Sequence, residues 1–282
     1  MLGTLQKAPT GPWEAGLEDA LAAVIAQGGR PPDRDDRLGP DSLNALNEAA
    51  ASAGLRAGPD RPLRFIDAGS LGRLSAVGYE THIGRHGEVP TRCEGHGVWH
   101  DWYNALVWLA WSSTKRALNE AQCRLIRVQT RECPTGNGRS AGRDSITLFD
   151  ESGLVMVCDQ PRLRAALRAH GWQTLFVTDR EAFDRHVRIW SVGHGLLDKL
   201  RQPFKAVCGR AWILPVEPAL PRRHVDARLA AMIAAGLPMG DALHPLPVLG
   251  IPGWWADNEQ AGFYDDPAVF RAARGLRPRH HA

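Results

Sequence analysis

The feature that most constrains this fold is the segment 99–112, which reads WHDWYNALVWLAWS. Its apolar residues occupy nearly the whole circumference of a helix instead of one stripe, and such a helix is usually buried on most sides. We therefore expect a central helix over 99–112, with the other elements of the chain packed around it. Three polar residues enter this apolar helix near its start: His100, Asp101 and Asn104.

Hydrophobic periodicity and turn residues predict the other elements. The run ITLFDESGLVMV at 146–157 holds two apolar stretches around four polar or small residues, a pattern that indicates a β-hairpin. The fold class is therefore α+β, mostly α-helical with a small β-hairpin and a few short strands, in a single main domain. Helices are expected over 17–27, from Asp41 or Ser42 to 53, from Thr114 onward, from 161 to Gly171, from 178 to about 200, over 225–235 and briefly after Asp266, with short strands over 64–67 and 173–177.

The chain divides by composition into three parts. Residues 1–62 are predicted to form variable N-terminal helices and a linker, residues 63–274 the main α-rich domain, and residues 275–282 a basic tail. Within the main domain, the polar, glycine-rich stretch 132–144 predicts a loop. The stretch 244–255 contains three prolines, so we expect it to be irregular yet ordered. No GxGxxG or GxxxxGK[ST] motif occurs, and no βαβ alternation is visible, which argues against dinucleotide-binding and P-loop folds.

Charge and cysteine content limit the partners and the compartment. The net charge is +3, and only four of the 34 basic residues are lysine. Since no dense basic run occurs outside 271–279, nucleic acid is a possible partner but not a favoured one. The five cysteines are scattered without a CxxC pair, which predicts free thiols in a reducing compartment. The longest apolar runs are seven residues, whereas a membrane span needs about 18, so we expect a cytoplasmic protein without membrane segments.

Several motifs occur in a fixed order along the chain. They are PTR at 90–92, HDWYNALVW at 100–108, KRALNEAQ at 115–122, RDSITLFDESG at 143–153, GHGLLDKL at 193–200, PLPVLGIPGWW at 245–255 and FYDDPAVFR at 263–271. Together these motifs resemble a proteobacterial family, the domain of unknown function 3025, over roughly Tyr79 to Arg271. The resemblance implies an intracellular bacterial protein, and it implies no particular activity or cofactor.

The strongest candidate site is the group at the start of the central helix. His100 and Asn104 lie one helical turn apart, and a polar side chain buried without a partner costs about 1–3 kcal/mol, so these groups must be hydrogen-bonded or face a cavity. We expect His100 to act as acid or base, Asp101 to orient it, and Arg92 to bind an anionic group. The alternative is a closed structural network that fixes the helix.

Further candidates lie elsewhere in the sequence. His194 lies one turn before Asp198, and a carboxylate can orient an imidazole as a general base; the alternative is a structural histidine. Arg143 and Asp144 are predicted to contribute to binding, and Trp254 to line a pocket. Asp150 and Glu151 are expected to be exposed turn residues. The His100–Asp101 dipeptide also occurs in metal-dependent phosphohydrolases, but the following residues do not match that class, and we assign no metal ligands.

These candidates support two classes of function. The first is an enzyme, with a hydrolase as one candidate, acting on a small polar or phosphorylated anionic molecule through the His/Asp/Asn/Arg cluster. The second is a non-catalytic protein that binds nucleic acid or another ligand. A concave pocket containing His100 would favour the enzyme, whereas a flat face lined by arginine would favour nucleic acid. The sequence assigns no cofactor and no oligomeric state.

Overall fold

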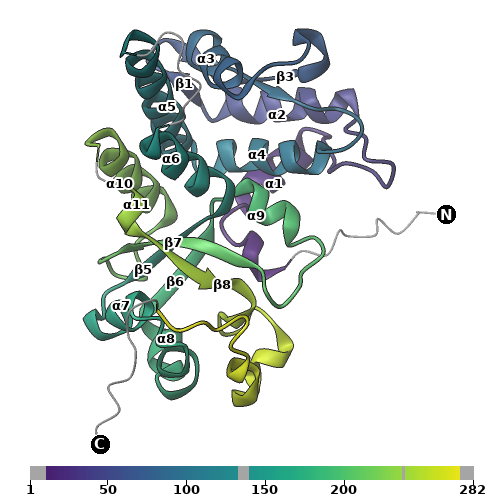
Figure 1. The fold of residues 1–282 in the computed structure, drawn as a ribbon. Coiled ribbons are helices and arrows are strands. Elements are labelled where there is room, and N and C mark those ends of the chain that lie inside the picture. Colours follow the sequence, from purple (N-terminus) through teal and green to yellow (C-terminus); the bar gives the residue numbers. More distant parts are fainter. Residues whose placement is uncertain (1–10, 133–139, 237–238, 274–282) are drawn as a thin grey trace, which may run out of the picture.

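The predicted central helix is present in a computed structural model, which describes residues 11–132, 140–236 and 239–273 (Figure 1). This helix, α4 (Val98–Ala110), has apolar side chains on almost every side. Trp102 and Trp108 are 2% and 1% exposed, which confirms that the helix is buried. The other helices and a small sheet therefore pack around α4.

Helices cover the part of α4 that faces away from the main sheet (Figure 1). Two short strand pairs connect them: β1 with β2 is antiparallel, and β3 with β4 is parallel. The predicted strand 64–67 is confirmed as β3. The elements of this part are α1 (Glu18–Ala26), α2 (Pro40–Ser52), β1 (Arg56–Gly58), β2 (Arg61–Pro62), β3 (Arg64–Asp67), α3 (Ala76–His86), β4 (Glu88–Thr91) and α5 (Ser112–Glu132).

A four-stranded mixed sheet forms the middle of the molecule, in the order β6-β5-β7-β8. Strand β5 lies inside the sheet and is buried along its whole length. It pairs in parallel with β7 and antiparallel with β6. Such an all-apolar strand, GLVMVC, is typical of a position covered on both faces. The strands are β5 (Gly153–Cys158), β6 (Val187–Ser191), β7 (Cys208–Leu214) and β8 (Leu243–Pro247).

The remaining helices pack on the sheet and on α5. α10 lies along α5, and α7 and α8 lie at the opposite end of the molecule (Figure 1). The C-terminal segment follows β8 as a series of short 3-10 turns, and Leu246, Val248, Leu249 and Ile251 are buried there. The helices are α6 (Ala141–Ser152), α7 (Pro161–Arg168), α8 (Arg180–His186), α9 (His194–Lys199), α10 (Arg222–Ala234) and α11 (Met239–Ala242), with 3-10 turns at Pro12–Glu14, Ala68–Leu71, Val248–Gly250, Ala256–Glu259 and Ala261–Asp265.

The fold class is confirmed, but several predicted elements are wrong. The predicted hairpin over 146–157 is a helix followed by a strand, because Ser140 caps α6 and this helix continues to Ser152. The predicted long helix 178–200 is interrupted by β6, which pairs with β5. The predicted strand 173–177 is a short π-helix over Thr174–Thr178. The predicted helix after Asp266 is a turn, and β8 gives a regular strand to the segment predicted to be irregular.

The N-terminal helices are part of the same core as the main domain. Val24 of α1 and Leu46 of α2 are completely buried and belong to the apolar cluster that contains α4. Of the five cysteines, Cys93, Cys123, Cys158 and Cys208 are free thiols, and Cys133 lies outside the described residues. The loop predicted over 132–144 is wrong at its ends, because 132 belongs to α5 and 141–144 to α6, and residues 133–139 and the predicted basic tail lie outside the described residues. Over the described ranges, no helix is long and apolar enough to cross a membrane.

Candidate functional site

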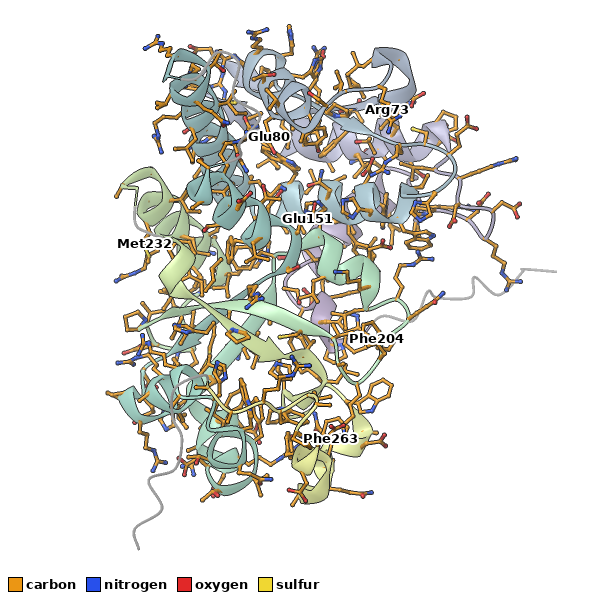
Figure 2. The ribbon with its side chains drawn as sticks, in the orientation of Figure 1. Arg73, Glu80, Glu151, Phe204, Met232 and Phe263 are labelled. Atoms are coloured by element: carbon orange, nitrogen blue, oxygen red, sulfur yellow. The ribbon has the colours of Figure 1, made fainter. Side chains whose placement is uncertain are left out.

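A cavity of about 260 Å³ opens between α3, α4, α5, α6 and the start of α9. Polar side chains dominate its wall, although the surrounding helices are packed on apolar faces. Glu80 and Glu151 both lie on the helical side of the main sheet (Figure 2). The lining residues are Ala76, Tyr79, Glu80, Ile83, Arg92, His100, Asp101, Asn104, Trp108, Lys115, Leu118, Asn119, Gln122, Ile146, Thr147, Asp150, Glu151 and His194.

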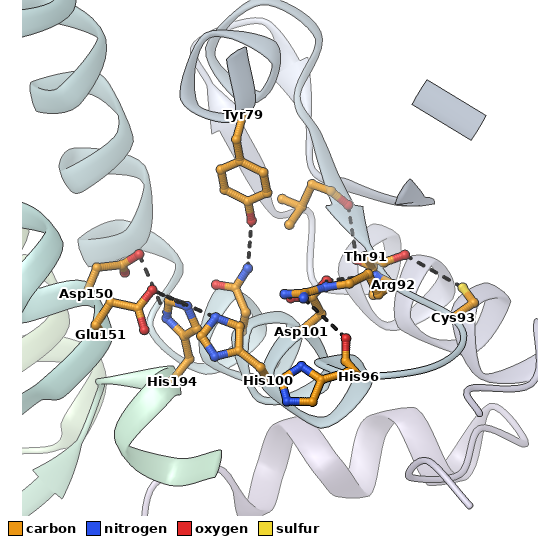
Figure 3. A network of polar contacts seen from close by, with 12 residues as sticks. Tyr79, Thr91, Arg92, Cys93, His96, His100, Asp101, Asp150, Glu151 and His194 are labelled. Carbon is orange, nitrogen blue, oxygen red and sulfur yellow. Dashed lines mark hydrogen bonds and ion pairs between the residues drawn. The ribbon is translucent and has the colours of Figure 1, made fainter. Parts of the chain in front are cut away.

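Two histidines and a carboxylate converge on one side of the cavity (Figure 3). The rings of His100 and His194 meet edge to face, with centroids 4.5 Å apart and planes at 70°. The Oε1 atom of Glu151 lies 3.8 Å from Nε2 of His100 and 3.5 Å from Nε2 of His194. His100 comes from α4, Glu151 from the end of α6 and His194 from the start of α9, so three segments distant in sequence form this cluster.

Glycines on both sides of His194 allow this close approach. A methyl group on Gly193 would overlap the backbone nitrogen of Gly153, and one on Gly195 would overlap Oε2 of Glu151. Both glycines therefore serve the close packing of α9 against the end of α6. The absence of a side chain at Gly195 leaves room for the Glu151 carboxylate against the backbone of α9.

Asp150 and Lys115 form an ion pair behind the two histidines. The Nζ atom of Lys115 lies 2.5 Å from Oδ1 of Asp150, and only 5% of the Lys115 side chain is exposed. The Oδ2 atom of Asp150 lies 3.8 Å from Nδ1 of His194. Burial raises the pKa of Asp150, but the charge and hydrogen bond of Lys115 outweigh it, so the pKa of Asp150 lies below its ordinary value. Asp150 is therefore a carboxylate at neutral pH.

Burial determines the charge of His194 and raises the pKa of Glu151. Only 6% of the His194 side chain is exposed, and burial lowers the pKa of His194 to about 3, so the ring is neutral at physiological pH. Burial and then the charge of Asp150 raise the pKa of Glu151, while His100 and Lys115 oppose that shift. A neutral imidazole beside a carboxylate can accept a proton, orient a water molecule or coordinate a cation.

Two of the predicted site residues, Arg92 and Asp101, bind each other. Arg92 donates to Oδ2 of Asp101 through its backbone N–H and through Nε, both at 2.8 Å, and to Oδ1 through Nη2 at 2.7 Å. Gly97, which has φ +96°, makes this possible, because a side chain there would overlap the Arg92 guanidinium. Asp101 thus fixes the guanidinium at the first turn of α4, on the far side of His100 from Glu151 (Figure 3).

The opposite wall of the cavity is a network of buried polar groups. Asn104 donates through Nδ2 to the Tyr79 hydroxyl at 2.8 Å, and Asn119 donates through Nδ2 to Oε2 of Glu80 at 2.6 Å. Burial and then the charge of Asp150 raise the pKa of Glu80 to about 7. Because Oδ1 of Asn104 and Nε1 of Trp108 are buried without a hydrogen-bond partner, this wall offers one acceptor and one donor to a ligand.

The structure brings together five of the eight residues predicted for the site, namely Arg92, His100, Asp101, Asn104 and His194. The other three are not among the described residues that line the cavity. Arg143 is buried behind the wall, where it donates through Nε to Oε1 of Gln122 at 3.2 Å. Asp144 is exposed in the first turn of α6, and Trp254 packs half-buried against the core near the C-terminus.

Sequence reasoning missed several lining residues and misplaced two. Asp150 and Glu151 were expected in an exposed turn, but they end α6 and face the cavity. A helical pattern was available in the sequence, because Arg143, Ile146 and Asp150 are spaced as i, i+3 and i+7. The equivalent helical spacing i, i+4 and i+7 places Lys115, Asn119 and Gln122 on one face of α5, and Ala76, Glu80 and Ile83 on one face of α3.

His100, Glu151 and His194 are also the described residues with the geometry of a metal site. One candidate ligand atom from each lies within 4.8 Å of the others. Two imidazoles and one carboxylate suit divalent transition metals, whereas Mg²⁺ and Ca²⁺ prefer oxygen ligands. No metal ligands were assigned from the sequence, because the residues after the His100–Asp101 dipeptide do not match metal-dependent phosphohydrolases.

Comparison with known proteins confirms the family resemblance. The family model described as "Protein of unknown function (DUF3025)" matches residues 63–274, most of the chain. No curated protein and no solved structure matches this chain. The chain belongs to the DUF3025 family.

Proposed function

We propose that this member of the DUF3025 family is a hydrolytic enzyme that acts on a small polar molecule in the cavity around His100, Glu151 and His194. One observation carries the proposal: the Glu151 carboxylate lies between two imidazoles at the wall of a cavity, 3.8 Å and 3.5 Å from their Nε2 atoms. Separations of this size leave room for a water molecule that bridges the groups. A water molecule held there contacts Glu151, which can act as a base, and faces the cavity.

The three side chains then have distinct roles in the proposed reaction. The oxygen of the water forms a bond to a carbonyl or phosphoryl centre of the substrate, and its proton moves to Glu151. The bond to the leaving group breaks, and the leaving group takes a proton from His100, the more exposed of the two histidines. Solvent returns the proton from Glu151 to His100. His194, which is buried and neutral, orients the water.

Glu80 gives the cavity a second group suited to proton transfer. It lines the same cavity, and a carboxyl group with a pKa of about 7 is present in both protonation states near neutral pH. The hydrogen bond from Asn119 fixes its orientation. A substrate bound between Glu151 and Glu80 would have an acid and a base available on different sides.

Charge and size restrict the substrate. The cavity volume of about 260 Å³ is at the low end of ligand pockets, so the substrate is small. Arg92 and Lys115, the cationic groups in the described wall, are bound to Asp101 and Asp150, which leaves Glu80 and Glu151 without a cationic partner there. We therefore favour a neutral polar substrate, and an anionic group would enter together with a cation.

The cavity also bears on the competing function and on the compartment. His100 lies in a concave pocket, which favours an enzyme over a nucleic-acid-binding protein.

Four free thiols suit a reducing compartment, and we place the enzyme in the bacterial cytoplasm.

Hydrolysis of a panel of small esters, amides and phosphoesters tests the proposal. The wild type should hydrolyse at least one neutral member, and Glu151→Gln should reduce that rate by about 100-fold or more, because a general base is removed. Glu181→Gln is the matched control, since Glu181 is exposed on α8 and pairs with Arg185. Equal rates for Glu151→Gln and the wild type on the hydrolysed substrate would exclude this site.

A further inference from the structure

We infer that His100, Glu151 and His194 bind a divalent transition-metal ion through their two Nε2 atoms and Oε1. The ion would hold the attacking water, and in that role it rests on the proposed function. With His100 and Glu151 as ligands, the proton transfers assigned to them would pass to Glu80, which lines the same cavity. Its binding can nevertheless be measured without any substrate. Nothing in the motifs of the sequence assigns this ion, because the three ligands lie on three separate helices and meet only in the fold.

The spacing of the three atoms suits an ion after a small closure. Ligands about 2.1 Å from a tetrahedral ion lie about 3.4 Å from one another. The carboxylate oxygen is already 3.5 Å from Nε2 of His194 and 3.8 Å from Nε2 of His100, and one candidate ligand atom of each residue lies within 4.8 Å of the others. The half-buried His100 side chain has the freedom to close the remaining distance. Three protein ligands leave a coordination position open to the cavity, as in catalytic rather than structural sites.

The groups behind His194 form the outer shell that such an ion requires. A metal-bound histidine usually donates its other ring N–H to a carboxylate. The Nδ1 atom of His194 is buried, makes no hydrogen bond, and faces Oδ2 of Asp150 at 3.8 Å. Asp150 is fixed in turn by Lys115. In this arrangement Nε2 of His194 is directed at Glu151, and a proton on Nδ1, facing Asp150, would leave Nε2 free to coordinate a metal.

The charge of the cavity also favours a cation. Four carboxyl groups line it, and its two cationic side chains are bound to Asp101 and Asp150. Glu151 lies against the imidazoles of His100 and His194 and not against a lysine or arginine of the described residues, so a divalent ion would supply the missing positive charge. The same ion would give an anionic substrate group the cationic partner that Arg92 and Lys115 do not offer.

Metal binding to the full-length chain tests the inference. After removal of bound metal with a chelator, the protein is titrated with Zn²⁺ and with Co²⁺, whose visible absorption reports coordination. We expect one ion per chain, and binding at least about 100-fold weaker in His100→Gln and in Glu151→Gln. Asp150→Asn keeps all three ligands but removes the carboxylate that faces Nδ1 of His194, and it should weaken metal binding about 10-fold.

His186→Gln is the matched control, because His186 forms a similar half-buried pair with Asp159 outside the cavity and should leave binding unchanged. Unfolding curves show whether each variant is folded. The double variant His100→Gln/His194→Gln retains His280 and His281, so any binding it keeps comes from elsewhere in the chain. Should the double variant misfold, the Co²⁺ spectrum of the wild type decides between nitrogen and thiolate ligands.

The inference is overturned if the folded wild type binds neither ion, if His100→Gln and Glu151→Gln bind like the wild type, or if a thiolate-to-cobalt band places the ion on cysteines. Failure of the hydrolytic proposal is a separate result. Hydrolysis that depends on Glu151 but persists after metal removal would leave the enzyme without an ion. Metal bound by the three residues without hydrolysis of any panel member would support the ion alone.

Discussion

Asp101 accepts three hydrogen bonds from Arg92, two from the guanidinium and one from the backbone N–H. The guanidinium and the carboxylate are therefore paired in a bidentate manner, which is the strong form of such contacts. Arg92 was expected to bind an anionic substrate and Asp101 to orient His100. Those roles remain predictions, and the observed geometry connects the end of β4 to the first turn of α4 and holds the start of the central helix in place.

This pair predicts a loss of stability on mutation. Asp101→Asn should lower the free energy of unfolding by about 1–3 kcal/mol, because charge-assisted hydrogen bonds to a mostly buried carboxylate are lost. Urea unfolding measures the change. In the control, Glu181→Gln removes an exposed pair on α8 and should cost less than about 1 kcal/mol. Similar losses in both variants would mean that Asp101 contributes no more than a surface ion pair.

Glu80 predicts a pH dependence of stability. Its pKa rises from an ordinary value of 4.5 to about 7 in the folded protein, so the folded state binds more protons than the unfolded state between these values. Stability from this group is fully present below pH 4.5 and is lost as the pH rises through 7. The whole effect is about 3 kcal/mol.

Glu80→Gln tests this dependence, because glutamine keeps an acceptor for Asn119 but carries no charge. We compare the free energy of unfolding of the variant with that of the wild type at pH 5 and at pH 8.5. The difference should shift in favour of the variant by about 2–3 kcal/mol between these two pH values. In the control, Glu120→Gln changes an exposed residue on α5, and its free energy of unfolding should differ from that of the wild type by the same amount at pH 5 and pH 8.5. A Glu80→Gln curve parallel to that of the wild type across this range would contradict the raised pKa.

The start of the candidate site was predictable from the sequence, and the reason is physical. His100, Asp101 and Asn104 interrupt a helix that is otherwise apolar, and polar groups in such a place need partners or a cavity. Local sequence was sufficient to find them, because helical spacing alone puts His100 and Asn104 on one face. The central helix was predicted for the same reason.

The other half of the site depends on contacts that local sequence does not encode. The run Ile146 to Phe149 contains β-branched and aromatic residues, which favour a strand, but the cap at Ser140 and packing on α5 make it helical. That change moves Asp150 and Glu151 from a turn into the cavity. In the predicted helix 178–200, pairing with β5 makes Val187–Ser191 a strand, so His194 begins a new helix.

His100→Gln separates a functional histidine from a structural one. The His100 side chain is 27% exposed, so its replacement should change the free energy of unfolding by less than about 1 kcal/mol. The rate of hydrolysis should fall by about 100-fold or more, because the proton donor to the leaving group is lost. Thermal unfolding and the ester panel are measured on the same preparation. A variant that unfolds early, with unchanged rate per folded molecule, would identify a structural role.

Gly195 offers a way to disturb the site without removing any of its functional groups. A methyl group at this position would overlap Oε2 of Glu151 and lie 3.1 Å from the Glu151 backbone oxygen. Gly195→Ala should therefore push the carboxylate away from the two imidazoles. Alanine favours the helical conformation by about 1 kcal/mol over glycine, and this gain offsets the cost of displacing the carboxylate. The free energy of unfolding should therefore change little.

We expect Gly195→Ala to reduce hydrolysis and Zn²⁺ binding at least tenfold, since both require Glu151 between the two Nε2 atoms. Gly78→Ala in α3 is the matched control, because a methyl group there meets only ordinary contacts at 3.4 Å and beyond. A double-mutant cycle identifies the route. In a Glu151→Gln background, Gly195→Ala should cause little further loss, because the displaced carboxylate is already absent. Independent, multiplicative losses would show that Gly195 acts through another contact.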